Sequence, residues 1–337
     1  MDWEKAILYA QLVNEAYAPE PNDLRNRGGQ VVSAGRGAAA TTFDILTTIY
    51  ANDLATQASK ERGDAVKTVS IGLLLQAQGS GDVVVAIRGT VGIREWVEDA
   101  QFNTEEFTRV AAAGRTEDGF TDTYDSMTIG SGPQDIPGTV KLAGGLEKFW
   151  GWKRPVTSLT ICGHSLGGAL ATLFALDVAA NTLAPFKTPV VYTYASPKTG
   201  DQDFRGKYQE LVATTYRLVD NVDIVPKGPP EPEYLHVCDG IIMKSLQLLP
   251  PRVRLQPNPV CWHILTSYLC LMSLASGGAH IKPEGKCRPD ALIKDIIAHI
   301  RAVFRTRKSL AKDFRYSDRW NLDPGSCEYE HGGAQAR

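Results

Sequence analysis

Residues 156–180 of this 337-residue chain read VTSLTICGHSLGGALATLFALDVAA and contain the pattern G-x-S-x-G from Gly163 to Gly167. Apolar and β-branched residues lead into the pattern, and an almost wholly apolar stretch of helical length leaves it. A strand, a sharp turn and a helix in that order form the elbow that presents a nucleophilic serine. The sequence therefore predicts that Ser165 is a nucleophile, lifted out of the sheet and exposed for chemistry, with glycines where strand and helix approach closely.

The start of the helix after Ser165 adds an electrostatic function. A helix N-terminus favours negative charge, and the backbone N–H of Leu166 can donate to an oxyanion that forms beside the serine. The elbow thus predicts one half of an oxyanion hole as well as the nucleophile.

Strand and helix patterns alternate along the rest of the chain. We expect helices at residues 3–17, 141–150 and 166–180, and extended segments at 69–76, 83–88, 156–162, 189–194 and 214–219. Residues 20–40 are rich in glycine and predict an irregular loop. Such alternation indicates an α/β fold of the α/β-hydrolase type, with a central, mainly parallel sheet flanked by helices and functional residues after the strand ends.

The composition is that of a globular protein, with 43% hydrophobic and 22% charged residues. Thirty-six basic against 38 acidic residues give a net charge of -2, which argues against nucleic acid as a partner. We predict a single domain over residues 1–337, in which residues 285–337 form a C-terminal helical extension whose role the sequence leaves open.

Membrane and export signals are weak in this chain. The apolar stretch at residues 260–275 is shorter than a bilayer span, so we expect no transmembrane anchor. The N-terminus lacks the basic and apolar pattern of a signal peptide, which predicts a cytoplasmic protein or one exported without a classical signal peptide. The six cysteines form no C-x-x-C pair, so no metal site is predicted.

A serine nucleophile needs an acid and a base, and these follow the serine in the order acid, then histidine, in an α/β-hydrolase. Asp220 and Asp223 both follow the predicted strand at 214–219, and geometry alone leaves them equal candidates. The later histidines satisfy the order, and they are His236, His263, His280, His299 and His331.

Several stretches together resemble the class 3 lipases, the fungal-type triacylglycerol lipase family. Besides the elbow, they are VAIRGT at residues 85–90 with Trp96 and Asp99 downstream, NVDIVP at 221–226 and YLHV at 234–237. The resemblance runs from about residue 65 to about residue 270 in the family's order. The chain departs from the family's H-x-G-F segment, because Glu117 stands where the histidine is expected.

The resemblance implies roles for individual residues. It favours Asp223 over Asp220 as the acid and His263, which precedes an apolar helix, over His280 as the base. It places Thr90 in the oxyanion hole with Leu166. His236 is expected in a strand with a structural role, and His299 and His331 lie beyond the resemblance.

The family also has a short helical lid, and the apolar stripe that would correspond to it includes Ile93, Trp96 and Val97. One apolar stripe is equally typical of a fixed surface helix, so the sequence leaves lid and fixed helix open.

These residues predict a serine ester hydrolase that cleaves fatty-acyl esters, as a triacylglycerol lipase or carboxylesterase, through a Ser-His-Asp triad and an acyl-enzyme. The alternatives are a phospholipase A1, a feruloyl-type esterase and, outside catalysis, an inactive hydrolase-fold module that binds lipid. The expected partner is a lipid or acyl-ester substrate. A lipid–water interface is a place where the protein could bind such a substrate. The chemistry requires no cofactor and no metal.

Overall fold

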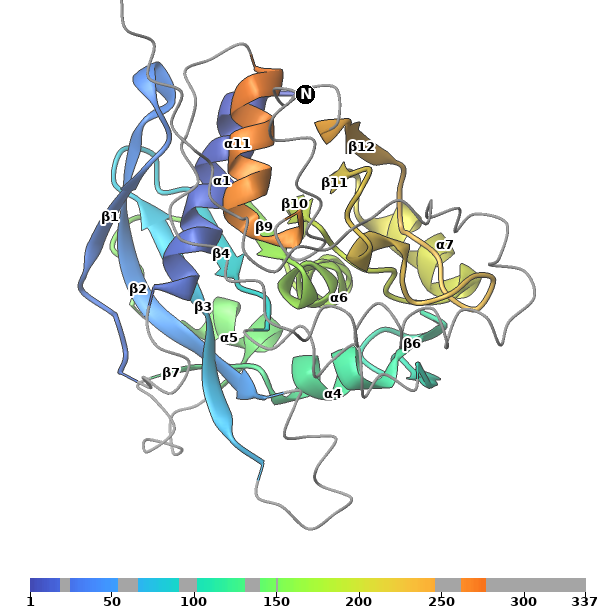
Figure 1. Cartoon of the computed structure of the whole chain (residues 1–337). Helices are drawn as coiled ribbons and strands as arrows, with labels where there is room; N and C mark the ends of the chain where they lie inside the picture. The colour runs from blue at the N-terminus through green and yellow to red at the C-terminus, as the bar shows by residue number, and fades with distance from the viewer. Residues whose placement is uncertain are drawn as a thin grey trace, which may run out of the picture.

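A ten-stranded sheet with helices on both faces organises the molecule (Figure 1). The computed structural model describes residues 1–18, 25–53, 66–90, 102–130, 140–149, 151–245 and 262–276. The strands run in the order β12-β11-β10-β9-β4-β3-β2-β7-β8, and β1 pairs with β2. Their bounds are β1 Val31–Ala34, β2 Thr41–Asn52, β3 Thr68–Ala77, β4 Val83–Ile87, β7 Thr128–Gly130, β8 Val140–Lys141, β9 Leu159–His164, β10 Val190–Tyr194, β11 Thr214–Asp220 and β12 Gly240–Met243.

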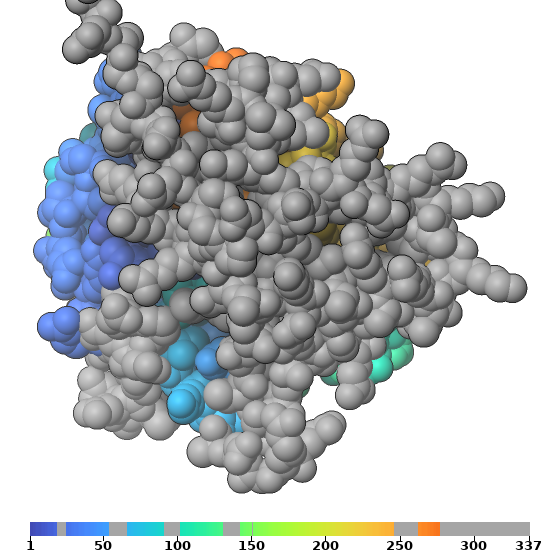
Figure 2. Space-filling view, viewed as in Figure 1, coloured from blue at the N-terminus to red at the C-terminus, as the bar shows by residue number. Residues whose placement is uncertain are grey.

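The five strands β4, β9, β10, β11 and β12 are parallel to one another, whereas β3, β2, β7 and β8 continue the sheet in antiparallel pairs. The antiparallel strands β1 and β2 lie along one flank of the molecule, at the left in the space-filling view (Figure 2). A separate small ribbon pairs β5 Thr104–Glu106 with β6 Arg115–Glu117. Because parallel strands end at one edge, the loops after β4, β9 and β11 meet there.

Two layers of helices bury the two faces of the sheet. On one face lie α1 Trp3–Tyr17 and α11 Leu265–Ala275, side by side. On the other face lie α4 Asp118–Ser126, α5 Leu142–Lys148, α6 Leu166–Asn181 and α7 Gln202–Leu211. Strand β4 is apolar at every position because Val83, Val85 and Ile87 pack toward α6 while Val84 and Ala86 pack toward α1.

Helix α6 is the central helix of its layer. Every residue from 166 to 179 is buried, since α4, α5, α7 and the sheet surround the helix. This explains why the sequence after the G-x-S-x-G pattern has almost no polar face. Short 3₁₀ helices lie at Gly37–Ala39 and Val225–Lys227.

Most of the helices and strands predicted from sequence are confirmed, and the differences have physical reasons. The predicted loop at residues 20–40 is wrong at β1, which is a short strand with a mostly exposed pattern. Strand β2 was missed because it buries Asp44, Thr47 and Thr48 and contains register shifts that break the alternation of polar and apolar residues. Strand β9 begins at Leu159 and runs to His164, so the predicted strand at 156–162 is displaced toward the elbow.

Among the described residues, no helix is both long and apolar enough to cross a membrane, and the apolar stretch near residue 265 forms the 11-residue α11. The predicted extension at residues 285–337 lies outside the described residues.

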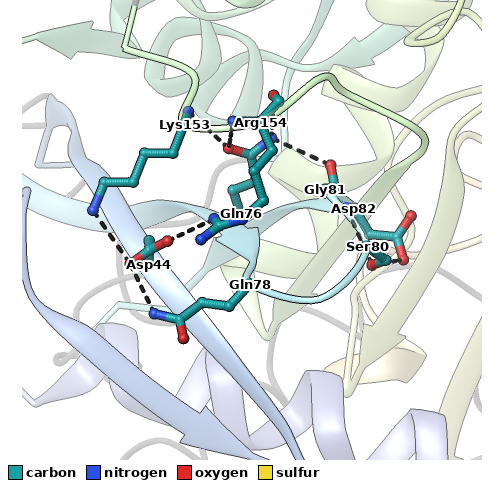
Figure 3. Close-up of polar contacts among 8 residues, drawn as sticks. All are labelled: Asp44, Gln76, Gln78, Ser80, Gly81, Asp82, Lys153 and Arg154. Carbon is teal, nitrogen blue, oxygen red and sulfur yellow. Dashed lines mark hydrogen bonds and ion pairs between the residues drawn. The ribbon is translucent and has the colours of Figure 1, made fainter.

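A buried polar clamp holds the segment that leads into β9 (Figure 3). Gln76 of β3 is fully buried, and its Nε2 donates to the carbonyls of Gly81 (3.3 Å) and Arg154 (2.8 Å). Its Oε1 accepts from the backbone N–H groups of Lys153 (3.0 Å) and Arg154 (3.1 Å). Asp44 of β2 lies 2.7 Å from Arg154 Nη1 and 3.2 Å from Lys153 Nζ. One side chain of the sheet therefore satisfies four main-chain groups.

We predict that Gln76→Leu lowers the free energy of unfolding by about 2–4 kcal/mol, because it leaves these main-chain groups buried without partners. Urea unfolding of the parent and the variant measures the change. The matched control is Gln78→Leu, which removes an exposed glutamine with a single side-chain bond to Asp44 and should cost less than about 1 kcal/mol. Equal losses in the two variants would contradict the clamp.

Candidate active site

The ends of the parallel strands bring three loops together. Ile87 at the end of β4 pairs with Gly163 of β9, and Tyr194 at the end of β10 pairs with both His164 and Leu218. The segments that follow β4, β9 and β11 begin with Arg88, Ser165 and Asn221. The sheet register therefore places the Gly89–Thr90 corner, the serine and the two aspartates at one edge.

The turn at Ser165 has the backbone strain of a nucleophile elbow. Its φ is 57° and its ψ is -127°, a region that residues other than glycine rarely adopt. The backbone N–H of Ser165 donates to the Tyr194 carbonyl at 2.9 Å, which holds the turn against the neighbouring strand. A Cβ at Gly163 would lie 2.0 Å from the Gly167 carbonyl oxygen, so only glycine fits where strand and helix cross.

Hydrogen bonds link Ser165 to His263 and His263 to Asp223. The Nε2 of His263 lies 2.8 Å from Ser165 Oγ, and its Nδ1 lies 2.9 Å from Asp223 Oδ2 and 3.1 Å from Oδ1. Asp223 also accepts from the Val225 N–H at 3.0 Å and from the Tyr268 hydroxyl at 2.8 Å. These bonds fix the carboxylate so that it orients the imidazole, and the imidazole in turn is placed to take the serine proton.

The whole triad is buried. Exposed fractions are 3% for Ser165, 5% for His263 and 0% for Asp223. The expectation that Ser165 is exposed is therefore wrong in this structure. The serine is lifted out of the sheet by its strained turn, but Gly89 of the neighbouring strand end and the His263 ring pack against it.

Asp220, the competing acid, does not reach the histidine. It is fully buried at the end of β11, and its Oδ1 accepts from the Ser245 N–H at 3.4 Å. Within the described residues its Oδ2 has no hydrogen-bond partner. Burial raises the pKa of this carboxyl to about 6. Residue spacing alone could not separate the two aspartates, because the difference depends on which one the turn after β11 directs toward His263.

His236 has a structural place, although the predicted strand around it is wrong. Only an isolated bridge between Leu235 and Gly200 forms there. The Nε2 of His236 lies 2.7 Å from the Pro226 carbonyl, and burial lowers its pKa to about 3. His280, His299 and His331 lie outside the described residues.

The predicted oxyanion residues flank the elbow. Leu166 is the first residue of α6, and Thr90 directly follows Gly89, whose own Cα lies against Ser165. The stripe with Ile93, Trp96 and Val97 lies outside the described residues. In the part of the chain that the structure describes, no three His, Cys, Asp or Glu side chains are grouped to hold a metal ion.

Two residues near this edge acquire a structural explanation that the sequence did not provide. Glu117, which replaces the family's histidine, caps α4 by accepting from the Phe120 N–H at 2.7 Å, and burial raises its pKa to about 8. Tyr17, the last residue of α1, reaches His164 and Gly89 through its hydroxyl. Helical periodicity accounted for α1 as a packing helix, so nothing in the pattern distinguished Tyr17.

The parallel strands, the strained serine turn at the end of β9 and the helices on both faces define an α/β-hydrolase fold. Residues 84–233 match the family Lipase (class 3). This match covers less than half of the chain, and over these residues the chain is similar to the class 3 lipases, the family that its sequence resembled.

Among similar proteins, Phospholipase A1-II 4 of Oryza sativa subsp. japonica is 32% identical over 211 residues, which cover 60% of this chain and 52% of that protein. Secreted mono- and diacylglycerol lipase 1 of Fusarium solani is 27% identical over 183 residues, or 48% of this chain and 50% of that protein. A solved mutant form of MDLA from Penicillium cyclopium has a TM-score of 0.49 at 20% identity and covers 72% of this chain and 78% of that one. The chain spans about half the length of the curated relatives it matches.

The geometry predicts that the two aspartates respond differently to the same substitution. Asp223→Asn should lower kcat for a soluble ester about a thousandfold or more, because the amide no longer holds the imidazole in the productive tautomer. Asp220→Asn, made at the same strand end, should stay within about threefold of the parent. Steady-state kinetics of both variants decide the point, and a larger loss in Asp220→Asn would reverse the assignment.

Burial of Asp220 also predicts a pH dependence of stability. Its folded pKa of about 6 lies above the usual unfolded value of about 3.9, so the unfolded chain loses this proton first as pH rises. The free energy of unfolding should therefore fall between about pH 4 and pH 6, by about 1–3 kcal/mol from this group. Relative to the parent, Asp220→Asn should then be more stable at pH 7.5 than at pH 4 in urea unfolding. A stability difference that is the same at both pH values would contradict the raised pKa.

Proposed function

We propose that this chain is a serine ester hydrolase that cleaves fatty-acyl esters of glycerolipids. The observation that carries the proposal is the continuous hydrogen-bonded set of Ser165, His263 and Asp223 on a strained elbow. Three side chains of these types, each within bonding distance of the next, are the requirement for activating a serine hydroxyl.

In the acylation step, Ser165 Oγ attacks the ester carbonyl while His263 Nε2 takes the hydroxyl proton. Asp223 accepts from Nδ1–H and stabilises the imidazolium that results. The negative charge on the carbonyl oxygen is bound by the backbone N–H groups of Leu166 and Thr90. Collapse of the tetrahedral intermediate breaks the ester bond, and the imidazolium returns its proton to the leaving alcohol.

In the deacylation step, water replaces the alcohol. His263 takes a proton from the water as the oxygen attacks the acyl-serine carbonyl, and the same N–H groups hold the second oxyanion. The proton then returns to Ser165 Oγ as the fatty acid leaves. Each step uses groups that stay in place, so little reorganisation accompanies the charge movement.

The substrate class follows from the family rather than from the triad, because any ester carbonyl satisfies the chemistry. Class 3 lipases act on lipids, and the Fusarium relative carries the name of a mono- and diacylglycerol lipase. Neutral glycerides are therefore the first candidate. Phospholipase A1 activity is the second, since several relatives at 30–34% identity bear that name.

We expect Ser165→Ala to lower ester turnover by about 10⁴-fold or more while changing the thermal midpoint little. Alanine removes the Oγ and keeps the same backbone. The control is Ser196→Ala, which removes another buried serine hydroxyl close to α6 but outside the triad, and it should retain turnover. Hydrolysis of a soluble ester and labelling by a fluorophosphonate give the two measurements.

Retained turnover in Ser165→Ala would end the proposed mechanism, and a parent protein that never labels would favour an inactive lipid-binding module. A panel of triolein, a diacylglycerol and phosphatidylcholine, each as defined vesicles or emulsions, separates the two substrate candidates. Release of fatty acid from phosphatidylcholine alone would replace the first candidate by the second.

A further inference from the structure

The hydroxyl of Tyr17 connects two parts of the candidate active site that are far apart in sequence. Tyr17 ends α1, which packs against α11 and the sheet on the face opposite α6 (Figure 1). Its oxygen lies 2.7 Å from the backbone nitrogen of Gly89 and 2.7 Å from Nδ1 of His164. The other ring nitrogen of His164, Nε2, lies 2.7 Å from the main-chain carbonyl oxygen of His263.

The direction of each bond in this chain follows from chemistry. A carbonyl oxygen only accepts, so His164 Nε2 carries the proton that it donates to His263. Burial lowers the pKa of His164 well below its usual range, so the ring is neutral and Nδ1 has no proton. The Tyr17 hydroxyl must then donate to Nδ1, and its oxygen accepts from the Gly89 N–H. The chain runs without a break from Gly89 through Tyr17 and His164 to His263.

Both ends of this chain are parts of the site that must be in place together. At one end, Gly89 precedes Thr90, and Arg88 Nη1 donates to the Gly89 carbonyl at 2.8 Å, so both the N–H and the C=O of this corner are held. At the other end, the carbonyl that His164 binds belongs to the residue whose ring contacts Ser165. His164 itself adjoins Ser165, and its ring lies 4.9 Å from the His263 ring.

We propose that Tyr17 and His164 are positioning residues, which hold the Gly89–Thr90 corner and the main chain of His263 at fixed places around Ser165. The proposal rests on the proposed function, and it adds a residue of α1, outside the segment that matches the family, to the machinery. An error of about 1 Å in such a site is enough to slow the chemical step about a hundredfold.

A neutral His164 also suits the charge that forms during catalysis. When His263 takes the serine proton it becomes an imidazolium, and a second positive ring at 4.9 Å would oppose it. Because both nitrogens of His164 are already committed, one as donor and one as acceptor, the ring gains no partner by taking another proton. The Tyr17 hydroxyl thereby keeps His164 in the tautomer that can bind the His263 carbonyl.

The test is Tyr17→Phe, which removes one oxygen and keeps the ring packing of α1. We expect kcat for a soluble p-nitrophenyl ester to fall about ten- to a hundredfold, KM to change less than about threefold, and the rate of inactivation by a fluorophosphonate to fall with kcat. Titration with the fluorophosphonate counts reactive sites, so that kcat is expressed per folded molecule. The thermal midpoint is recorded for each protein.

The matched control is Tyr9→Phe, on the same helix. The Tyr9 hydroxyl is bonded only weakly, by the Thr160 hydroxyl at 3.4 Å, and its ring contacts Tyr192 rather than the triad. This variant should keep the parent kcat and inactivation rate. A lowered midpoint in Tyr17→Phe with an unchanged kcat per site would overturn the proposal, as would an equal loss of kcat in Tyr9→Phe.

The same experiment separates this inference from the function on which it rests. A parent that hydrolyses ester and labels at Ser165, with Tyr17→Phe equal to it, removes only the positioning role. A parent that neither hydrolyses nor labels removes the proposed function and the positioning role together. A slower Tyr17→Phe that still labels to completion supports both.

Discussion

The strained turn at Ser165 is the constraint on which the rest of the structure depends. A serine at φ 57° persists only where its surroundings hold it, and here strand β9, the Tyr194 carbonyl and the first turn of α6 do so together. The absence of a Cβ at Gly163 permits the close crossing of strand and helix. The polar clamp around Gln76 then fixes the chain on the entering side of β9, far from the turn itself.

Burial is the second common feature of this edge of the sheet. Ser165, His263, Asp223 and His164 are all nearly inaccessible, so each polar atom that lacks water must find a protein partner. The hydroxyl groups of Tyr17 and Tyr268 supply two of these partners, one to His164 and one to Asp223. Asp220 is one exception, because its Oδ2 has no hydrogen-bond partner among the described residues, and burial raises the pKa of this carboxyl.

The elbow and the order of strands and helices could be predicted from the sequence, because apolar runs and glycine spacing are local signals. Ser165 follows from those signals alone. The choice of Asp223 over Asp220 and of His263 over His280 needed the family resemblance, since both depend on how distant loops meet. Neither the local sequence pattern nor the family resemblance indicated Tyr17. A tyrosine at a helix end gives the same pattern whether its ring only packs or its hydroxyl also forms a hydrogen bond. Strand β2 was hidden by buried polar residues, among them Asp44, whose partners Lys153 and Arg154 lie more than a hundred positions later.

The order in which the chain supplies its site has a consequence for biosynthesis. The described strands of the sheet are complete at Met243, and the segment that matches the family, residues 84–233, already contains Ser165 and Asp223. The histidine that would activate the serine comes only at position 263, on the far side of residues 246–261. A ribosome-bound chain can therefore assemble all the described strands of its sheet while the serine is still without its proposed base, which comes in one of the last described segments to emerge.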